Sequence, residues 1–293
     1  MGYRIKKNIA LLLVTSFAFT SCEELDISGM VRSYDPVNTR FEQSMEWNAA
    51  HPYREIIVTD DDYTILSMGD SHVGGTINLD IFYKDAKAKK SAAVVLVGDL
   101  TTGQAEDYDV FHQHIPNQDS LPSFFIAGNH DLYFNGWHQF YSRFGSSTYF
   151  FTVETNTAKD LFICLDTGGG TLGTRQLSWL SEILQKIRPE YRRCTVFTHN
   201  NFFRNRRTSS TNPQIEELRV LIELFTKNHV EMVITGHDHV HDVQLFGNTT
   251  YITMDALEDG QKNPGYFQIN VIDGYIDYRF INLKYFDLFP SEI

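Results

Sequence analysis

Five short motifs along the chain are made of residue types that bind metal ions. They are Asp70-Ser71-His72, Gly98-Asp99, Gly128-Asn129-His130-Asp131, His199-Asn200-Asn201 and Gly236-His237-Asp238-His239. Together they supply carboxylates, an amide and several imidazoles, a mixture that suits Mn, Fe or Zn, whereas Ca and Mg prefer sites built from oxygen alone. One ion cannot use so many ligands. The set therefore predicts two divalent metal ions, roughly 3.5–4 Å apart, that share one carboxylate.

The motifs follow apolar runs that are typical of buried strands. Six such runs, rich in Val, Ile and Phe, are Tyr63–Met68, Ala92–Val97, Ser123–Ala127, Leu161–Leu165, Thr195–Thr198 and Val230–Thr235. Loops at the carboxyl ends of parallel strands converge on one edge of a sheet, so we expect the motifs to meet there. Asp70, Asp99 and Asn129 are spaced by about 30 residues, the length of one strand-helix-strand unit. Successive motifs should therefore lie side by side.

Helical patterns separate the strands. Apolar residues recur at helical spacing from Tyr108 to Ile115 and from Leu177 to Ile187, and Asn212-Pro213 is typical of the start of another helix. Three further strands are predicted near the C-terminus, at Tyr251–Met254, Phe267–Val271 and Tyr275–Phe280, with a hairpin turn at Asp273-Gly274. We expect these antiparallel strands to belong to the second of two sheets.

The five motifs, in this order, resemble those of the calcineurin-like metallophosphoesterase superfamily, and the resemblance covers most of the chain from Tyr63 onward. It implies an α/β fold with two packed mixed β-sheets flanked by helices, a four-layer α/β/β/α sandwich. It also implies hydrolysis of phosphomonoester or phosphodiester bonds by a hydroxide that bridges two divalent metal ions. The implied substrate is a phosphate ester.

The resemblance carries roles to individual residues. It implies that Asp70, His72 and His239 bind the first metal, that Asn129, His199 and His237 bind the second, and that Asp99 bridges them. His130 matches the histidine that contacts the substrate and protonates the leaving oxygen, and Asp131 matches the acid that orients this histidine. Thr102 stands where the coloured acid phosphatases carry a tyrosine, which argues against an iron-tyrosinate site.

Other residues near the motifs have two interpretations each. Arg204, Arg206 and Arg207 either clamp an acidic group of the substrate or form a solvated loop. Tyr133, Phe134 and Trp137 either stack on a base or sugar or pack in the core. Asp166 and the glycines after it lack the phosphate-loop signature and are expected to form a flexible rim of the site. His241 is expected to be an exposed loop residue rather than a ligand.

Composition restricts the partners. The chain has 293 residues, 42% of them hydrophobic, which excludes a disordered or collagen-like protein. A formal net charge of −12 disfavours a general grip on long nucleic acid, because that requires clustered Lys and Arg. Three cysteines cannot form a disulfide framework, and Cys164 and Cys194 are predicted to be buried thiols.

The N-terminus is typical of a targeting segment. Arg4, Lys6 and Lys7 precede an apolar run of roughly ten residues, too short to span a bilayer, which ends near Cys22. The pattern resembles a bacterial lipoprotein signal; the alternative is a secretory signal with a chance cysteine. We therefore predict a signal peptide over residues 1–21, a lipidated tether with a short helix over 22–53, and the catalytic domain over 54–293. The predicted location is the cell envelope, with the outer membrane favoured over the inner.

Two other functions fit the same sequence. A non-catalytic surface lipoprotein could keep the fold and the metals for ligand binding, although such a protein has no need of His130 and Asp131. A hydrolase could also use the same metals to cleave a bond other than a phosphate ester.

Overall fold

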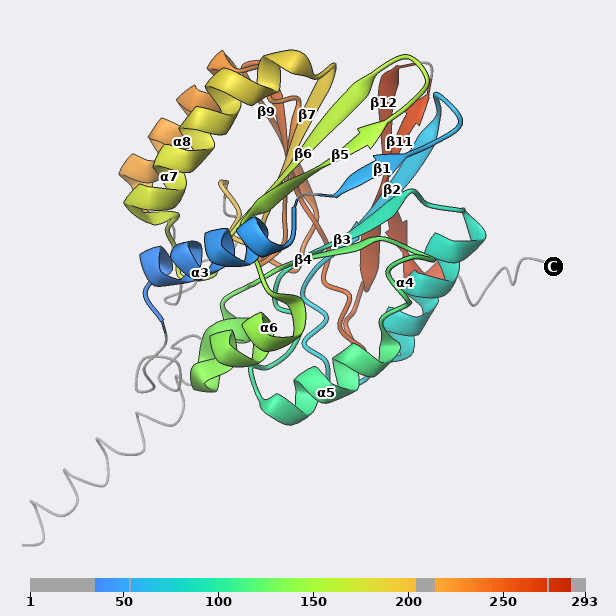
Figure 1. The fold of residues 1–293 in the computed structure, drawn as a ribbon. Helices are drawn as coiled ribbons and strands as arrows, with labels where there is room; N and C mark the ends of the chain where they lie inside the picture. The colour runs from blue at the N-terminus through green and yellow to red at the C-terminus, as the bar shows by residue number, and fades with distance from the viewer. Residues whose placement is uncertain (1–34, 53, 204–213, 273, 286–293) are drawn as a thin grey trace, which may run out of the picture.

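Two packed β-sheets form the centre of the molecule (Figure 1). The computed structural model describes residues 35–52, 54–203, 214–272 and 274–285. One sheet contains β2 (Tyr63–Met68), β3 (Ala93–Val97), β4 (Ser123–Ile126), β11 (Gly265–Ile272) and β12 (Tyr275–Asn282). Its order is β12-β11-β2-β3-β4, in which β2, β3 and β4 are parallel and β11 and β12 are antiparallel.

The second sheet has seven strands. They are β1 (Glu55–Ile57), β5 (Tyr149–Glu154), β6 (Lys159–Leu165), β7 (Arg193–Thr198), β8 (Met232–Thr235), β9 (Asp242–Phe246) and β10 (Thr249–Thr253). The order is β1-β5-β6-β7-β8-β10-β9, and β6, β7, β8 and β10 run parallel to one another. Because helices or the other sheet cover both faces of β6 and β8, residues 161–165 and 232–234 are apolar in succession rather than in alternation.

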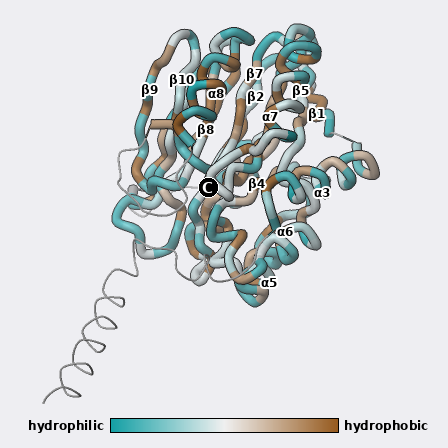
Figure 2. Tube along the Cα trace, turned by 90° about the vertical axis from the view of Figure 1, so that its left-hand side faces the viewer, coloured by the Kyte–Doolittle hydropathy of each residue, from teal (hydrophilic) through white to brown (hydrophobic). Residues whose placement is uncertain are grey.

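The main core lies between the sheets. Ile65 and Val95 of the first sheet and Phe151, Phe197 and Ile234 of the second are fully buried in one cluster. In Figure 2, hydrophobic residues recur along the strands, whereas most connecting loops are hydrophilic. The two sheets are therefore held together by a continuous apolar layer.

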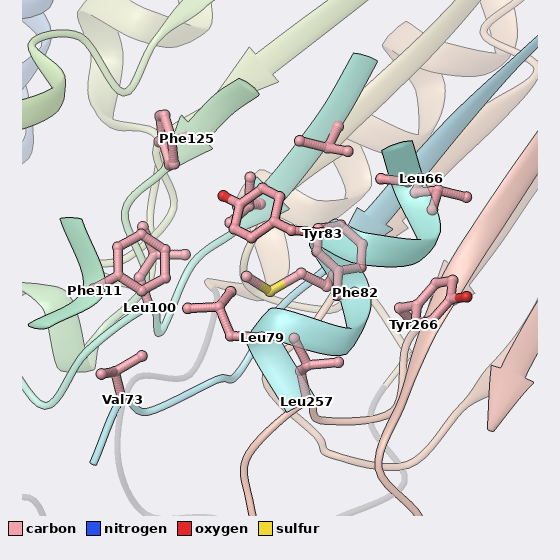
Figure 3. Packing of buried hydrophobic residues seen from close by; sticks show 14 of the residues in the cluster. Leu66, Val73, Leu79, Phe82, Tyr83, Leu100, Phe111, Phe125, Leu257 and Tyr266 are labelled. Atoms are coloured by element: carbon pink, nitrogen blue, oxygen red, sulfur yellow. The ribbon is translucent and has the colours of Figure 1, made fainter. Parts of the chain in front are cut away.

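Helices cover the outer faces of both sheets. They are α3 (Val37–Ala50), α4 (Ile77–Ala88), α5 (Ala105–His114), α6 (Gly136–Phe144), α7 (Gly173–Glu182) and α8 (Ile215–Lys227). Short helices of other types are η1 (His130–Asn135), η2 (Ile183–Ile187), η3 (Arg188–Glu190) and η4 (Leu283–Tyr285). Helices α4, α5 and α6 pack on the five-stranded sheet, where Leu79 and Phe82 of α4 and Leu66 of β2 belong to one buried cluster (Figure 3). Helices α7 and α8 cover the seven-stranded sheet, and α3 lies against α7 (Figure 1).

This arrangement confirms the four-layer α/β/β/α sandwich. The predicted strands are all present with small differences at their ends, and β2, β3 and β4 are neighbours as the motif spacing indicates. Strands β1, β5 and β9 were not predicted. Residues Ile272 and Tyr275 face each other across the predicted hairpin of β11 and β12.

One topological prediction is wrong. Strands β11 and β12 extend the first sheet, because β11 pairs with β2, and only the strand ending at Thr253 lies in the second sheet. The physical reason is that Phe267, Ile269 and Val271 of β11 complete the apolar layer beside β2. Sequence patterns that mark a strand as buried do not say which sheet it joins.

Several predictions fall on residues that the structure does not describe. These are the signal peptide, Cys22, the first part of the tether, Arg204, Arg206, Arg207 and the helix start at Asn212-Pro213. The short helix expected in the tether region is α3. Cys164 and Cys194 are buried free thiols, as predicted. Among the described helices, none is both long and apolar enough to cross a membrane.

Candidate metal centre

The five motifs meet at the carboxyl ends of β2, β3, β4, β7 and β8. Five of the predicted ligands have a positive φ, a backbone conformation that costs energy for residues other than glycine: Asp70 (54°), His72 (38°), Asp99 (50°), His237 (74°) and His239 (58°). Gly98 has φ 92°, and a Cβ there would lie 2.6 Å from the backbone nitrogen of Gly128. The first and second sheets thus hold these loops in close, strained contact.

One group of ligands comprises Asp70, His72 and His239, whose candidate ligand atoms lie within 4.8 Å of one another. His239 Nε2 lies 3.2 Å from Asp70 Oδ1 and 3.3 Å from His72 Nε2. The Asp70 carboxylate also accepts hydrogen bonds from the backbone N–H of His237 at 2.9 and 3.1 Å. Asp70 is fully buried, whereas the His239 side chain is 24% exposed, so this group faces the open side of the site.

A second group comprises Asp99, His199 and His237, all buried. His199 Nε2 lies 3.3 Å from Asp99 Oδ2, 3.1 Å from Asn129 Oδ1 and 3.2 Å from His237 Nδ1. His199 Nδ1 donates to the carbonyl oxygen of Val97 at 2.8 Å, and this bond turns Nε2 toward the other ligands.

Asp99 lies between the two groups. Its Oδ2 is 3.8 Å from His72 Nε2 and 3.3 Å from His199 Nε2, while Oδ1 accepts the backbone N–H of His130 at 2.8 Å. Ring nitrogens and carboxylate oxygens converge here on two neighbouring points. The donor set fits two divalent metal ions with Asp99 as their common ligand.

Attraction between carboxylates and imidazoles largely sets the pKa values of Asp70, Asp99 and His199. Burial disfavours charge on Asp70, but His239 and His199 outweigh it and hold the pKa of Asp70 at about 2. The pKa of Asp99 likewise lies well below its usual value, because His199 outweighs burial. Burial opposes charge on His199 too, yet Asp99 raises its pKa to about 9. Burial lowers the pKa of His72 to about 4.

These pKa shifts predict that Mn binding displaces a proton from His199. With a pKa of about 9, His199 is protonated at pH 7.5 in the metal-free protein, and Nε2 must lose its proton to bind Mn. Calorimetric titration in buffers of different ionisation enthalpy should show release of about one proton at pH 7.5, falling toward zero above pH 9. Equal enthalpies in all buffers at pH 7.5 would contradict this assignment.

The same pKa shift gives the metal-free protein a defined pH dependence. Because folding raises the pKa of His199 from 6.5 to about 9, its contribution to stability is complete below pH 6.5 and is lost as the pH rises to about 9.

His130 and Tyr133 line the site beside these ligands. The His130 ring lies 4.4 Å from that of His72 and 4.6 Å from that of Tyr133, between centroids. Asn129 Nδ2 donates to the Tyr133 hydroxyl at 2.9 Å. Of the three aromatic residues with two interpretations, Trp137 is buried in the core, whereas Tyr133 belongs to the site.

Asp131 does not have the contact expected of it. Its buried carboxylate accepts the backbone N–H groups of Leu100 at 3.1 Å, Thr101 at 3.1 Å and Gly128 at 2.9 Å. Among the hydrogen bonds of the described residues, none joins Asp131 to the His130 ring. The interpretation of Asp131 as the acid that orients His130 is therefore corrected: the carboxylate holds the second and third motifs together, since adjacent loop N–H groups need an acceptor where water is excluded.

Asp131→Ala is expected to lower the free energy of unfolding by about 3 kcal/mol, because it leaves three buried N–H groups without an acceptor. Urea denaturation of the metal-free protein measures this. Unchanged stability combined with a loss of kcat would restore the orienting role.

The remaining candidate residues near the motifs lie outside the two ligand groups. The loop that begins at Asp166 is fixed rather than flexible. Arg40 donates to the Asp166 carboxylate, and Glu217 accepts the backbone N–H of Leu172 at 2.6 Å. His241 is 54% exposed, as expected, and its Nδ1 lies 2.6 Å from Asp255. The sequence did not indicate Arg40: α3 also carries the exposed acids Glu42 and Glu46, and only Arg40, Phe41 and Ser44 of this helix are buried. The Thr102 hydroxyl donates to Asp107.

An α/β/β/α sandwich that carries Asp, Asn and His ligands at the carboxyl edge of both sheets defines a metallophosphoesterase-type protein. The profile of the family described as "Calcineurin-like phosphoesterase" matches residues 63–241, more than half of the chain. The chain therefore belongs to the calcineurin-like phosphoesterase family and is a hydrolase of the class that acts on phosphoric ester bonds. Comparison with curated proteins finds no match.

Solved structures with the same fold are distant in sequence. A dimetal phosphatase from Danio rerio is 12% identical, with a TM-score of 0.60, 75% of this chain covered and 96% of the other. GAP50, described as the anchor in the inner membrane complex of Plasmodium, is 14% identical, with a TM-score of 0.59 over 76% and 85%. A purple acid phosphatase from yellow lupin is 13% identical, with a TM-score of 0.56 over 76% and 52%.

Proposed function

We propose that this protein is a metal-dependent phosphoesterase that hydrolyses phosphomonoester or phosphodiester bonds at a dinuclear centre. The residues that would hold the metals are Asp70, His72 and His239 on one side, Asn129, His199 and His237 on the other, and Asp99 between them. The observation that carries the proposal is the position of the Asp99 carboxylate between two groups of candidate ligands. Mn, Fe and Zn suit this mixture of imidazole, amide and carboxylate.

Charge explains why metals are required for a phosphate substrate. At pH 7 the carboxylates of Asp70 and Asp99 contribute −2, because their pKa values are low, and protonated His199 contributes +1, so these groups sum to about −1 without metals, whereas two divalent ions add +4. When bound, the metals supply Lewis acidity that attracts phosphate oxygens and activates water. Without them the pocket repels a phosphate ester.

The chain's own residues would complete the reaction. Fixed by a bond from its backbone N–H to Asp99, His130 stands beside His72 at the edge of the ligand groups. An imidazole in this position can donate a proton to the leaving oxygen as the ester bond breaks. Tyr133 packs on the His130 ring and restricts its orientation.

The test is hydrolysis of aryl phosphates by the full chain purified in detergent, with and without Mn. We expect Mn-dependent release of nitrophenol from a monoester, a diester or both. Chelation of the metal should abolish the activity. Failure to cleave either compound or a panel of nucleotides after Mn loading would overturn the proposal. Products that contain no newly released phosphate monoester or inorganic phosphate would indicate a different bond.

We also propose that the protein is a lipoprotein of the bacterial cell envelope, anchored by lipid on Cys22. The support is the basic, apolar and small-residue pattern that precedes this cysteine. Long nucleic acid is not a proposed partner, because of the acidic composition.

Cys22→Ala is expected to remove the protein from the membrane fraction and to prevent incorporation of labelled palmitate. Fractionation and labelling of cells that express the full chain measure both effects. Retention of label in the variant would contradict the proposed anchor, and Cys194→Ala provides a control that should leave labelling unchanged.

A further inference from the structure

A buried ion pair ties α3 to the loop that follows β6. Arg40 is fully buried, and its Nε donates to Asp166 Oδ2 at 2.7 Å while Nη2 donates to Oδ1 at 3.2 Å. Its Nη1 donates to the carbonyl oxygen of Asp35 at 2.6 Å, and the guanidinium lies 5.9 Å from the ring centroid of Trp137. A buried ion pair is often no more stabilising than apolar residues of the same volume. The Arg40–Asp166 pair is therefore better explained by the position that it gives to the loop after β6 than by a gain in stability.

Asp166 shapes the loop in which it lies. Its Oδ1 accepts the backbone N–H of Gly168 at 3.1 Å. Gln176 of α7 holds the backbone of Asp166 from both sides, since Oε1 accepts its N–H and Nε2 donates to its carbonyl, each at 2.8 Å. The ion pair with Arg40 and the two hydrogen bonds with Gln176 therefore fix the position of Asp166.

The loop in turn braces the neighbours of two predicted ligands. Thr167 Oγ1 lies 2.8 Å from Thr198 Oγ1 and accepts the backbone N–H of Asn200 at 2.9 Å, so it contacts both residues that flank His199. Gly168 packs on the residue before Asn129, because a Cβ on Gly168 would lie 2.6 Å from the carbonyl oxygen of Gly128.

We propose that Arg40 is a positioning residue for the second metal, acting through Asp166 and Thr167 on His199 and Asn129. The proposal rests on the two-metal function proposed above. Within the described part of the chain, the hydrogen bonds of residues 166–168 do not reach Asp70, His72 or His239. The effect of Arg40 should therefore be confined to one of the two metals.

The test is calorimetric titration of the full chain with Mn. The double variant Arg40→Met/Asp166→Leu removes both charges and so leaves neither one buried and unpaired. We expect wild-type protein to bind two Mn ions. In the double variant, one Mn should bind as in the wild type and the other about 10–100-fold more weakly. A loss of this size is usual when the residues that orient a metal ligand are removed.

A matched control lies at the other end of the same strand. Asp160 of β6 is buried, and Arg192 donates to it through Nε at 3.0 Å and Nη2 at 2.6 Å. Arg192→Met/Asp160→Leu removes another Arg–Asp pair, whose arginine is 24% exposed, at the sheet edge opposite the metal ligands. We expect this variant to bind both Mn ions with wild-type affinity, even if its Tm falls.

A second variant keeps the proposal testable if the first does not fold. Thr167→Val removes the hydroxyl next to His199 without changing side-chain volume, and it should weaken the same single Mn site. Its control is Thr152→Val, because Thr152 of β5 has a buried hydroxyl with no hydrogen-bond partner among the described residues.

The outcomes separate the two proposals. Two Mn ions bound with wild-type affinity by Arg40→Met/Asp166→Leu or by Thr167→Val would overturn the role of Arg40, and so would an equal loss in the controls. Wild-type protein that binds no Mn would overturn the two-metal function, and with it this inference.

Discussion

Asp99→Asn protein is expected to bind at most one Mn ion tightly and to lose about a thousandfold in kcat/KM. Asp99 is the carboxylate that lies between the two ligand groups, and its charge outweighs burial to raise the pKa of His199. Asn keeps the acceptor for the His130 N–H and tolerates the left-handed backbone at this position, so the change isolates the lost charge. Losing preorganised charge stabilisation of this kind costs about 10²–10³ in rate, and loss of a metal adds to it.

Calorimetry with Mn and steady-state kinetics on an aryl phosphate measure the two effects. Asp255→Asn is the matched control, because Asp255 is a largely buried acid that follows β10 and binds His241 rather than a ligand. The control should bind two Mn ions. Retention of both ions and of activity in Asp99→Asn would exclude Asp99 as the shared ligand.

His130→Ala is expected to lower kcat by about 10²–10⁴ while the protein still binds two Mn ions, because His130 would supply a proton rather than a required metal bond. The loss should be greater for an alkyl phosphate than for a nitrophenyl phosphate, since nitrophenolate leaves readily without a proton. This dependence on the leaving group is the signature of a general acid.

His241→Ala is the control for His130→Ala. His241 is another partly exposed histidine at the same edge, paired with Asp255, and its removal should change kcat little. If the protein only bound ligands, neither the wild type nor the His130→Ala variant would hydrolyse these phosphates. Equal losses for alkyl and nitrophenyl phosphates would argue that His130 acts on ligand binding rather than on the proton.

Most of the fold was predictable because the candidate metal ligands directly follow the buried strands. Apolar runs such as Tyr63–Met68 mark fully buried parallel strands, and the polar residues after them mark one edge of the sheet. The grouping of the ligands came from the family resemblance, which implies that Asp70, His72 and His239 share one metal, and the candidate ligand atoms of these three residues do lie together.

What could not be predicted depends on contacts between distant residues. Strand β9 has only five residues, most of them exposed, and β1 has only three residues. Asp131 directly follows His130 within the third motif, yet it accepts N–H groups of another loop, so the family resemblance implied the wrong partner for it. Arg40 acts on a residue 126 positions away.

Under the anchor proposed at Cys22, the contact of Arg40 with Asp35 at the start of α3 would set how far the metal-binding edge of the sheets lies from a membrane. Asp35 is bonded to Arg40, and Arg40 to the loop that braces His199, so the tether joins the domain on the metal side. With lipid on Cys22, roughly 13 residue steps separate the bilayer from Asp35, and a fully extended chain of that length reaches about 45 Å. Under that proposal, a tether of this length would keep the metal centre close to the membrane, where it would encounter molecules at or near that surface far more often than those in the bulk solution.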